Sequence, residues 1–115
     1  MNYKGSCHCG KIAFEVEGEI GEVLACNCSM CSRKGNLMWF VPRPKLRLLT
    51  PESDASTYLF NKHSIRHRFC ASCGIHPFAE ATDPKGNPMA AVNARCLEGV
   101  EIEGLAVKKF NGRAL

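Results

Sequence analysis

Hydrophobic and polar residues alternate along the N-terminal part of the chain. Within residues 11–17, Ile12, Phe14 and Val16 are separated by mostly polar positions. A period of two residues is typical of a strand that buries one of its faces. Residues 37–41 are continuously apolar and aromatic, which predicts a buried strand. The pattern therefore indicates β-structure from the start of the chain.

Turn-forming residues separate these segments. Pro42 and Pro44 argue against continuing the 37–41 strand in the centre of a sheet. Residues 83–88, Asp-Pro-Lys-Gly-Asn-Pro, are a strong turn signal, and residues 61–64 predict a hairpin loop. Apolar segments around the turns predict further strands at residues 23–25, 46–49, 57–60, 65–69, 77–81 and 89–94. No segment keeps a helical period for three turns, so we expect short strands with a single helical turn.

Length and charge narrow the classes of protein. With 115 residues and 12.6 kDa, the chain is expected to form a single domain over residues 1–115. Its net charge of +4 permits an anionic ligand. The basic residues are scattered in small groupings, such as Arg66 with Arg68, that are typical of solvated surfaces. We therefore expect no nucleic-acid partner, and the longest apolar run, five residues, predicts no membrane span.

Eight cysteines are the most unusual feature of the composition. The N-terminus has neither the apolar region nor the cleavage site of a secretory signal. This predicts a cytoplasmic protein with reduced thiols, in which closely spaced cysteines bind metal more often than they form disulfides.

Two of the cysteine clusters have the spacing of chelating turns. They are Cys7-His8-Cys9-Gly10 and Cys70-Ala71-Ser72-Cys73-Gly74. The glycine after the second cysteine is suited to a left-handed conformation, which lets the backbone wrap around a metal ion. Brought together by the fold, these turns would form one tetrahedral four-thiolate zinc site. We interpret this site as structural, because metal binding would then stabilise a small core.

The middle cluster, Cys26-Asn27-Cys28-Ser29-Met30-Cys31, offers three thiolates. Three protein ligands leave the fourth tetrahedral position open, as in catalytic zinc sites. Three alternatives stay open. Cys96 would close the site and make it structural, the cysteines would hold an iron–sulfur cluster, or a histidine would be a ligand. The candidate histidines, each expected to be an ordinary strand or turn residue, are His8, His63, His67 and His76.

These motifs resemble the glutathione-dependent formaldehyde-activating enzymes, whose domain also occurs in centromere protein V. The resemblance extends over nearly the whole chain and rests on Gly5-Ser6-Cys7-His8-Cys9-Gly10, Cys26-Asn27-Cys28-Ser29-Met30-Cys31 with Lys34-Gly35, Phe69-Cys70-Ala71-Ser72-Cys73-Gly74-Ile75-His76, Val92-Asn93-Ala94-Arg95-Cys96-Leu97 and Phe110-Asn111-Gly112-Arg113. It implies an all-β fold of twisted antiparallel sheets stapled by zinc, a β-tent. It also implies two Zn²⁺ per chain, a structural ion on Cys7, Cys9, Cys70 and Cys73 and a catalytic ion on Cys26, Cys28 and Cys31.

The resemblance further implies a carbon–sulfur lyase-type reaction, the reversible addition of glutathione as co-substrate to formaldehyde or a related aldehyde. Zinc on the middle cysteines would deprotonate a substrate thiol. Arg33 and Lys34, just after the third ligand, are the nearest candidates for binding the glutathione carboxylates, and Arg95 is a weaker one. His76 lies close in sequence to a ligand, but no residue is identified as the general acid or base. The alternative is a non-enzymatic zinc module that binds protein or nucleic acid and in which both sites are structural.

Overall fold

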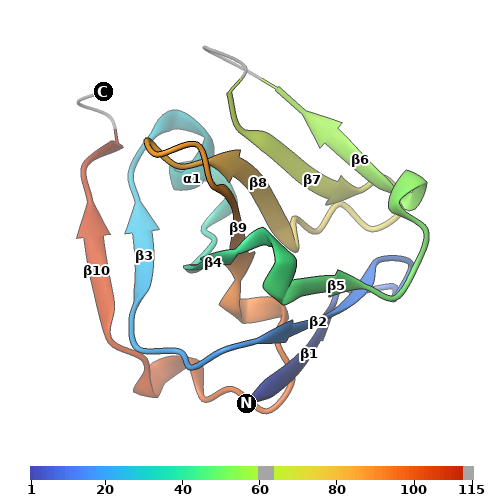
Figure 1. Ribbon diagram of the computed structural model, residues 1–115, viewed down its shortest axis with the longest axis horizontal. Helices are drawn as coiled ribbons and strands as arrows, with labels where there is room; N and C mark the ends of the chain where they lie inside the picture. Colours follow the sequence, from blue (N-terminus) through green and yellow to red (C-terminus); the bar gives the residue numbers. More distant parts are fainter. Residues whose placement is uncertain (60–63, 113–115) are drawn as a thin grey trace.

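The computed structural model describes residues 1–59 and 64–112, and these residues form a protein built almost entirely of strands (Figure 1). A small antiparallel sheet has the strand order β1–β2–β5. Its strands are β1 (Asn2–Ser6), β2 (Ala13–Glu17) and β5 (Leu46–Leu48). The sequence predicts β2 and β5 closely, whereas β1 was not predicted because it contains few apolar residues.

A larger sheet runs from β10, at the left of Figure 1, to β6, at the upper right. In spatial order its strands are β10 (Val107–Phe110), β3 (Val23–Cys26), β4 (Met38–Pro42), β9 (Pro88–Asn93), β8 (Phe78–Thr82), β7 (Arg66–Cys70) and β6 (Ala55–Tyr58). Every neighbouring pair is antiparallel except β10 and β3, which are parallel. The all-β expectation is confirmed for the described residues.

Helical structure is limited to short segments. The only α-helix of the described residues is α1 (Ser29–Lys34), between β3 and β4. Single 3₁₀ turns occupy Arg43–Lys45, Glu52–Asp54, Ala94–Cys96 and Ile102–Gly104. Within the described residues, no helix is long and apolar enough to cross a lipid bilayer. The predicted loop at residues 61–64 joins β6 and β7, and its residues 61–63 lie outside the described part of the chain.

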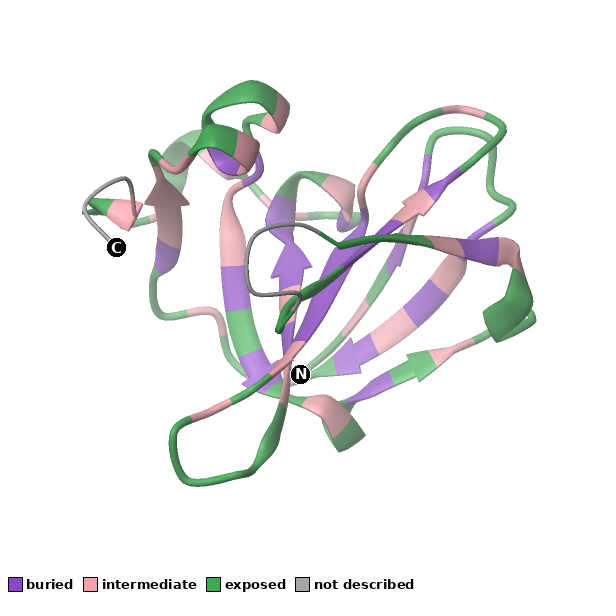
Figure 2. Ribbon diagram, turned by 90° about the horizontal axis from the view of Figure 1, so that it is seen from above, coloured by how far each residue is buried: buried purple, intermediate pink, exposed green. Residues whose placement is uncertain are grey.

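The core lies between the two sheets, and buried residues recur along the strands in Figure 2. Phe14 of β2 and Phe78 of β8 are completely buried, and their rings meet edge to face with centroids 6.1 Å apart. Gly5 of β1 lies against the Phe14 ring, and a Cβ there would come within 2.5 Å of it. Burying one such aromatic side chain stabilises the fold by about 2–3 kcal/mol. The core thus depends on contacts between distant strands.

Strand β4 differs from the expectation of a buried strand. Trp39 and Val41 are buried, but Phe40 between them is 50% exposed. Although β4 is central in the sheet, only one of its faces is covered. A continuous apolar run therefore does not distinguish a strand with one covered face from a strand with two.

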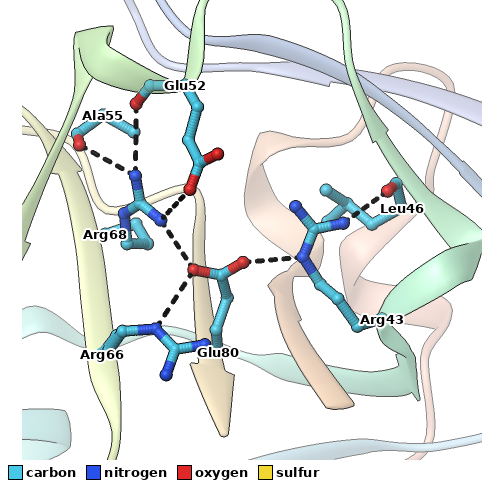
Figure 3. Close-up of polar contacts among 7 residues, drawn as sticks. All are labelled: Arg43, Leu46, Glu52, Ala55, Arg66, Arg68 and Glu80. Carbon is cyan, nitrogen blue, oxygen red and sulfur yellow. Dashed lines mark hydrogen bonds and ion pairs between the residues drawn. The ribbon is translucent and has the colours of Figure 1, made fainter. Parts of the chain in front are cut away.

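A buried ion cluster holds β7 and β8 to the turn after β4 (Figure 3). Glu80 accepts hydrogen bonds from Arg68 and Arg43, each at 2.6 Å, and lies 3.6 Å from Arg66. Arg68 also donates to the backbone oxygens of Glu52 and Ala55. The solvated surface expected for Arg68 is therefore wrong, because its side chain is only 6% exposed.

Candidate functional site

The two cysteine-containing turns of the four-thiol group are closed in a similar way, over three residues in one and four in the other. Cys7 follows β1, and Cys70 is the last residue of β7. The Gly10 N–H donates to the Cys7 carbonyl at 3.3 Å, and the Gly74 N–H donates to the Cys70 carbonyl at 2.8 Å. Both glycines are left-handed, with φ of 84° and 81°. The predicted glycine conformation is therefore confirmed in both turns.

These turns bring together Cys7, Cys9, Cys70 and Cys73, whose sulfur atoms all lie within 4.8 Å of one another. The Cys9 sulfur is 3.8 Å from that of Cys7 and 3.6 Å from that of Cys70. Four sulfurs bound tetrahedrally to zinc at about 2.3 Å are separated by about 3.8 Å, whereas a disulfide bond is about 2.0 Å long. The donor set and its spacing therefore fit a four-coordinate zinc ion.

The second group is formed by residues close in sequence. Cys26 ends β3, Cys28 caps the N-terminus of α1, and Cys31 is buried in that helix. The backbone N–H of Cys31 donates to the Cys28 sulfur at 3.3 Å, and that of Cys28 donates to the Cys26 sulfur at 3.4 Å. The three sulfurs lie within 4.8 Å of one another. This spacing fits a metal ion with three protein ligands.

The thiols of both groups differ in acidity. Burial, followed by the neighbouring Cys28, raises the pKa of Cys31 to about 12. Burial also acts to raise the pKa of Cys28, but the backbone N–H of Cys31 and further hydrogen bonds outweigh it, so this pKa is lowered. In the first group, the backbone N–H groups of Ile75 and Cys9 lower the pKa of Cys73 to about 6. Metal binding requires all ligand thiols to ionise, so it would release protons.

The C-terminal segment packs against the three-cysteine group. Strand β10 runs beside β3 with Phe110 opposite Cys26. The N–H of Asn27 donates to the Phe110 carbonyl at 3.1 Å, and its side-chain amide donates to Asn111 at 2.9 Å. A Cβ on Gly112 would lie 2.4 Å from the Cys26 sulfur. Only glycine permits the backbone to approach this group so closely.

A pocket of about 670 Å³ lies between α1 and the four-thiol group, and its volume is in the range of small-molecule sites. Helix α1 contributes Met30, Arg33 and Lys34, and the four-thiol group contributes Cys7. The other lining residues are Ser6, His8, Asn36, Gly74, Ile75, His76, Asn93, Arg95 and Cys96. Both residues predicted to bind glutathione, and the weaker candidate Arg95, therefore face one cavity.

The cations of α1 have different surroundings. Arg33 is exposed and donates to the Ser29 carbonyl one turn earlier, at 2.8 Å. Lys34 is half-buried, and its Nζ lies 3.1 Å from Nδ1 of the buried His67. Burial lowers the pKa of Lys34, while Cys31 and Cys28 oppose that shift. Burial and then Lys34 and His76 lower the pKa of His67 to about 4.

Buried amides form the floor of the pocket. Asn93 donates to Asn36 and to the His76 carbonyl, both at 3.2 Å, and lies 3.4 Å from the Cys96 sulfur. Burial, followed by Cys7 and Cys73, raises the pKa of Cys96 to about 11. Cys96 is thus near the four-thiol group, and the second group consists of Cys26, Cys28 and Cys31 without it. The alternative in which Cys96 closes the second site finds no support.

The candidate histidines also lie outside both thiol groups in the described residues. His8 is exposed at the pocket, His67 is a buried residue of β7, and His76 stacks on Phe69 with ring centroids 5.3 Å apart. His63 lies outside the described part of the chain. The described histidines therefore lie at the pocket or in a strand.

Comparison with known proteins decides the family. The family model described as glutathione-dependent formaldehyde-activating enzyme matches residues 2–107. The chain belongs to this family. A crystal structure of a Rhodobacter sphaeroides protein is similar, with 29% sequence identity and a TM-score of 0.80. The similarity covers 93% of this chain and 99% of that one. This family was the one that the cysteine motifs resembled, and the resemblance implied two metal sites, in agreement with the two cysteine groups of the structure.

The sequence did not indicate the role of several residues in and beside the pocket. Asn36 and Asn93 line the cavity, and His67 contacts Lys34 of its wall. These residues are separated along the chain, and nothing in their local sequence indicates that they meet there. His67 and its neighbour Arg68 are both buried in β7, so no alternation of polar and apolar residues marks either position. The thiol groups were found because their chemistry is visible in spacing alone.

Proposed function

We propose that the protein is a zinc-dependent carbon–sulfur lyase-type enzyme that adds glutathione reversibly to formaldehyde or a related aldehyde. The observation that carries the proposal is the three-cysteine group in and beside α1, the helix that also lines a cation-containing pocket. Three thiolates leave one tetrahedral position for a substrate thiol. Zinc bound there would supply the chemistry of deprotonating that thiol at neutral pH.

The two thiol groups are proposed to have different roles. Cys7, Cys9, Cys70 and Cys73 complete a tetrahedral set and would hold a structural zinc ion. Cys26, Cys28 and Cys31 would hold the catalytic ion. The Cys28 position at the N-terminus of α1 supports this, because the helix dipole and backbone N–H groups favour a thiolate there.

The pocket is proposed to bind the two carboxylate ends of glutathione. Arg33, Lys34 and Arg95 bring positive charge to its wall, and guanidinium groups bind carboxylates with good geometry. The chain's own residues would thus bind the tripeptide and orient its sulfur toward α1. Among the described residues, no ion pair engages these three side chains, so they are available to a ligand.

The decisive experiment measures the exchange rate between glutathione and S-hydroxymethylglutathione by magnetisation-transfer NMR, because the reaction also proceeds spontaneously. We expect the zinc-loaded protein to increase this rate and Cys28→Ala to abolish the increase. Cys96→Ala should keep two zinc ions, which tests the alternative in which Cys96 closes the second site. Exchange equal to the protein-free rate would overturn the proposal.

A non-enzymatic zinc module remains the competing function class, and its nucleic-acid version has a direct test. Binding to DNA or RNA with a steep salt dependence would support it. We expect no binding at physiological salt, because several cations of the described residues line the pocket or pair with carboxylates and the basic residues are scattered along the sequence.

A further inference from the structure

Lys34 is a half-buried cation that pairs with no carboxylate of the described residues. Among the ion pairs of residues 1–59 and 64–112, none includes Lys34. Its Nζ forms a hydrogen bond with Nδ1 of His67 at 3.1 Å. Removing a charge from water is costly unless another group compensates. The Cys31 and Cys28 thiols favour its charged form, and Lys34 also lines the pocket, so its charge can act on a group that enters there.

The bond to His67 defines the chemical state of both partners. A lysine ammonium can only donate hydrogen bonds, so Nδ1 of His67 must be the unprotonated acceptor. Burial, Lys34 and His76 lower the pKa of His67 to about 4, so the imidazole is neutral near pH 7 and its proton is on Nε2. His67 is 4% exposed and is held between β6 and β8. It is therefore a rigid, neutral acceptor that orients the ammonium without neutralising it.

Lys34 differs in this respect from its neighbour. Arg33 is exposed and bonds only its own helix backbone, so it can follow a flexible carboxylate. Lys34 is held from a second element, and the Cys31 and Cys28 thiols, proposed zinc ligands, act on it electrostatically. A fixed donor within electrostatic reach of the proposed zinc ligands suits the charge that develops during reaction better than it suits a remote carboxylate.

We propose that Lys34, oriented by His67, donates the proton that the aldehyde oxygen takes up when sulfur adds to the carbonyl carbon. This inference rests on the proposed function and identifies the general acid, which the sequence left unassigned. It replaces the carboxylate-binding role of Lys34 in the proposed function: Arg33 keeps that role, and Lys34 acts on the reacting oxygen. His67 is a positioning residue that acts through Lys34.

The proposed addition forms a carbon–sulfur bond and breaks the carbon–oxygen π bond. The thiol first gives its proton to solvent. The thiolate sulfur then forms a bond to the aldehyde carbon, the carbon–oxygen π pair moves to oxygen, and oxygen takes a proton from Lys34 Nζ. The hemithioacetal leaves, and the neutral amine recovers a proton from solvent. In the reverse direction the amine accepts the hydroxyl proton as the carbon–sulfur bond breaks. Nothing is oxidised or reduced.

The first test compares two variants of adjacent cations. Lys34→Met keeps the length of the side chain and removes its charge, and we expect kcat to fall about a hundredfold, the usual contribution of a proton donor, with little change in KM for glutathione. Arg33→Ala should raise KM about fivefold, the effect of an exposed ion pair, and leave kcat unchanged. A Lys34→Met enzyme with raised KM and normal kcat would make Lys34 a carboxylate anchor and overturn the proposal.

The second test asks whether His67 acts through Lys34. His67→Asn places an amide oxygen near the position of Nδ1 and should retain much of kcat, whereas His67→Leu should lose as much as Lys34→Met. The double variant with Lys34→Met should lose no more than either single change. Zinc content and melting temperature, measured for each variant, identify one that fails to fold. Additive losses would overturn the positioning role.

Two readouts do not depend on activity. Nitrogen NMR of the histidines should show His67 with its proton on Nε2, and its Nδ1 resonance should move in Lys34→Met. Calorimetry should give glutathione affinities that are normal for Lys34→Met and reduced for Arg33→Ala. An inactive wild-type protein would overturn the proposed function and this inference together. An active wild type whose Lys34→Met variant keeps its kcat would overturn only the role of Lys34.

Discussion

The two thiol groups differ in how far apart their members lie along the chain. In the four-thiol group, sulfurs 61 residues apart in sequence, those of Cys9 and Cys70, meet at 3.6 Å. The three-cysteine group falls within six residues, at the end of β3 and in α1. Closing a long loop costs chain entropy, which a bound metal offsets. A metal ion on the first group would therefore stabilise the tertiary fold. Loss of a metal ion from the second group would leave the protein folded.

The largest effect is expected from Cys70→Ser. Cys70 is completely buried and joins β7 to the turn after β1. Structural zinc contributes on the order of 10 kcal/mol, comparable to the whole stability of a small protein, so this variant should lose its cooperative unfolding transition. Calorimetry and near-UV circular dichroism measure the loss. A folded variant with one zinc ion would mean that the two groups do not differ in this way.

Glu80→Gln is expected to lower the stability of the protein without changing any thiol. It leaves Arg68, whose side chain is 6% exposed, without its charged partner, and breaking such a buried pair costs about 3 kcal/mol. Chemical denaturation should show this loss while metal analysis still gives two zinc ions. Loss of zinc in this variant would show that metal content follows stability in general and would remove the contrast between the groups.

Glu80 also predicts how the stability of the protein depends on pH. Burial acts to raise the pKa of Glu80, but Arg43 and Arg68 outweigh it, so the pKa lies below its ordinary value of 4.5. A lowered folded pKa stabilises the protein fully above the ordinary value, and this contribution is lost as pH falls through the folded pKa. Below about pH 4.5, the wild type should therefore lose stability more steeply than Glu80→Gln. Thiol protonation affects both proteins and cancels in the difference.

Cys28→Ser should have a smaller effect on stability and a large one on metal content. The variant is expected to bind one zinc ion instead of two and to unfold cooperatively, with a cost of about 1–2 kcal/mol. Metal analysis together with denaturation separates this result from that of Cys70→Ser. If Cys28→Ser unfolds as completely as Cys70→Ser, the second group is structural as well.

The smallest change is expected from Gly112→Ala. Its Cβ would lie 2.4 Å from the Cys26 sulfur, so the C-terminal segment must move away from this group. We expect zinc affinity of the three-cysteine group to fall about tenfold, as for other contacts around metal ligands, and the four-thiol group to be unaffected. Competition with a chelator measures both affinities. Gly21→Ala, which meets no atom within 4 Å, is the control and should leave both unchanged.

The sequence alone determined the features that depend on residues close together in the chain. The alternation of Ile12, Phe14 and Val16 predicted strand β2, because a strand exposes its two faces in turn. The positions of the cysteine turns, including the left-handed Gly10 and Gly74, followed from spacing, since chelation of one ion requires nearby ligands and a tight backbone. Family membership was visible for the same reason.

The tertiary structure decided what depends on distant segments. Strand β10 pairs in parallel with β3, and no local pattern at residues 107–110 marked it, because a solvent-exposed edge strand needs no alternation. Burial of Arg68 beside Glu80 depends on β7 and β8 being neighbours. The contact between Lys34 and His67, 33 residues apart, depends on where the fold places α1 relative to β7. A residue's burial and partners are set by packing between elements, so the chemistry of the pocket became visible only once the strands were placed.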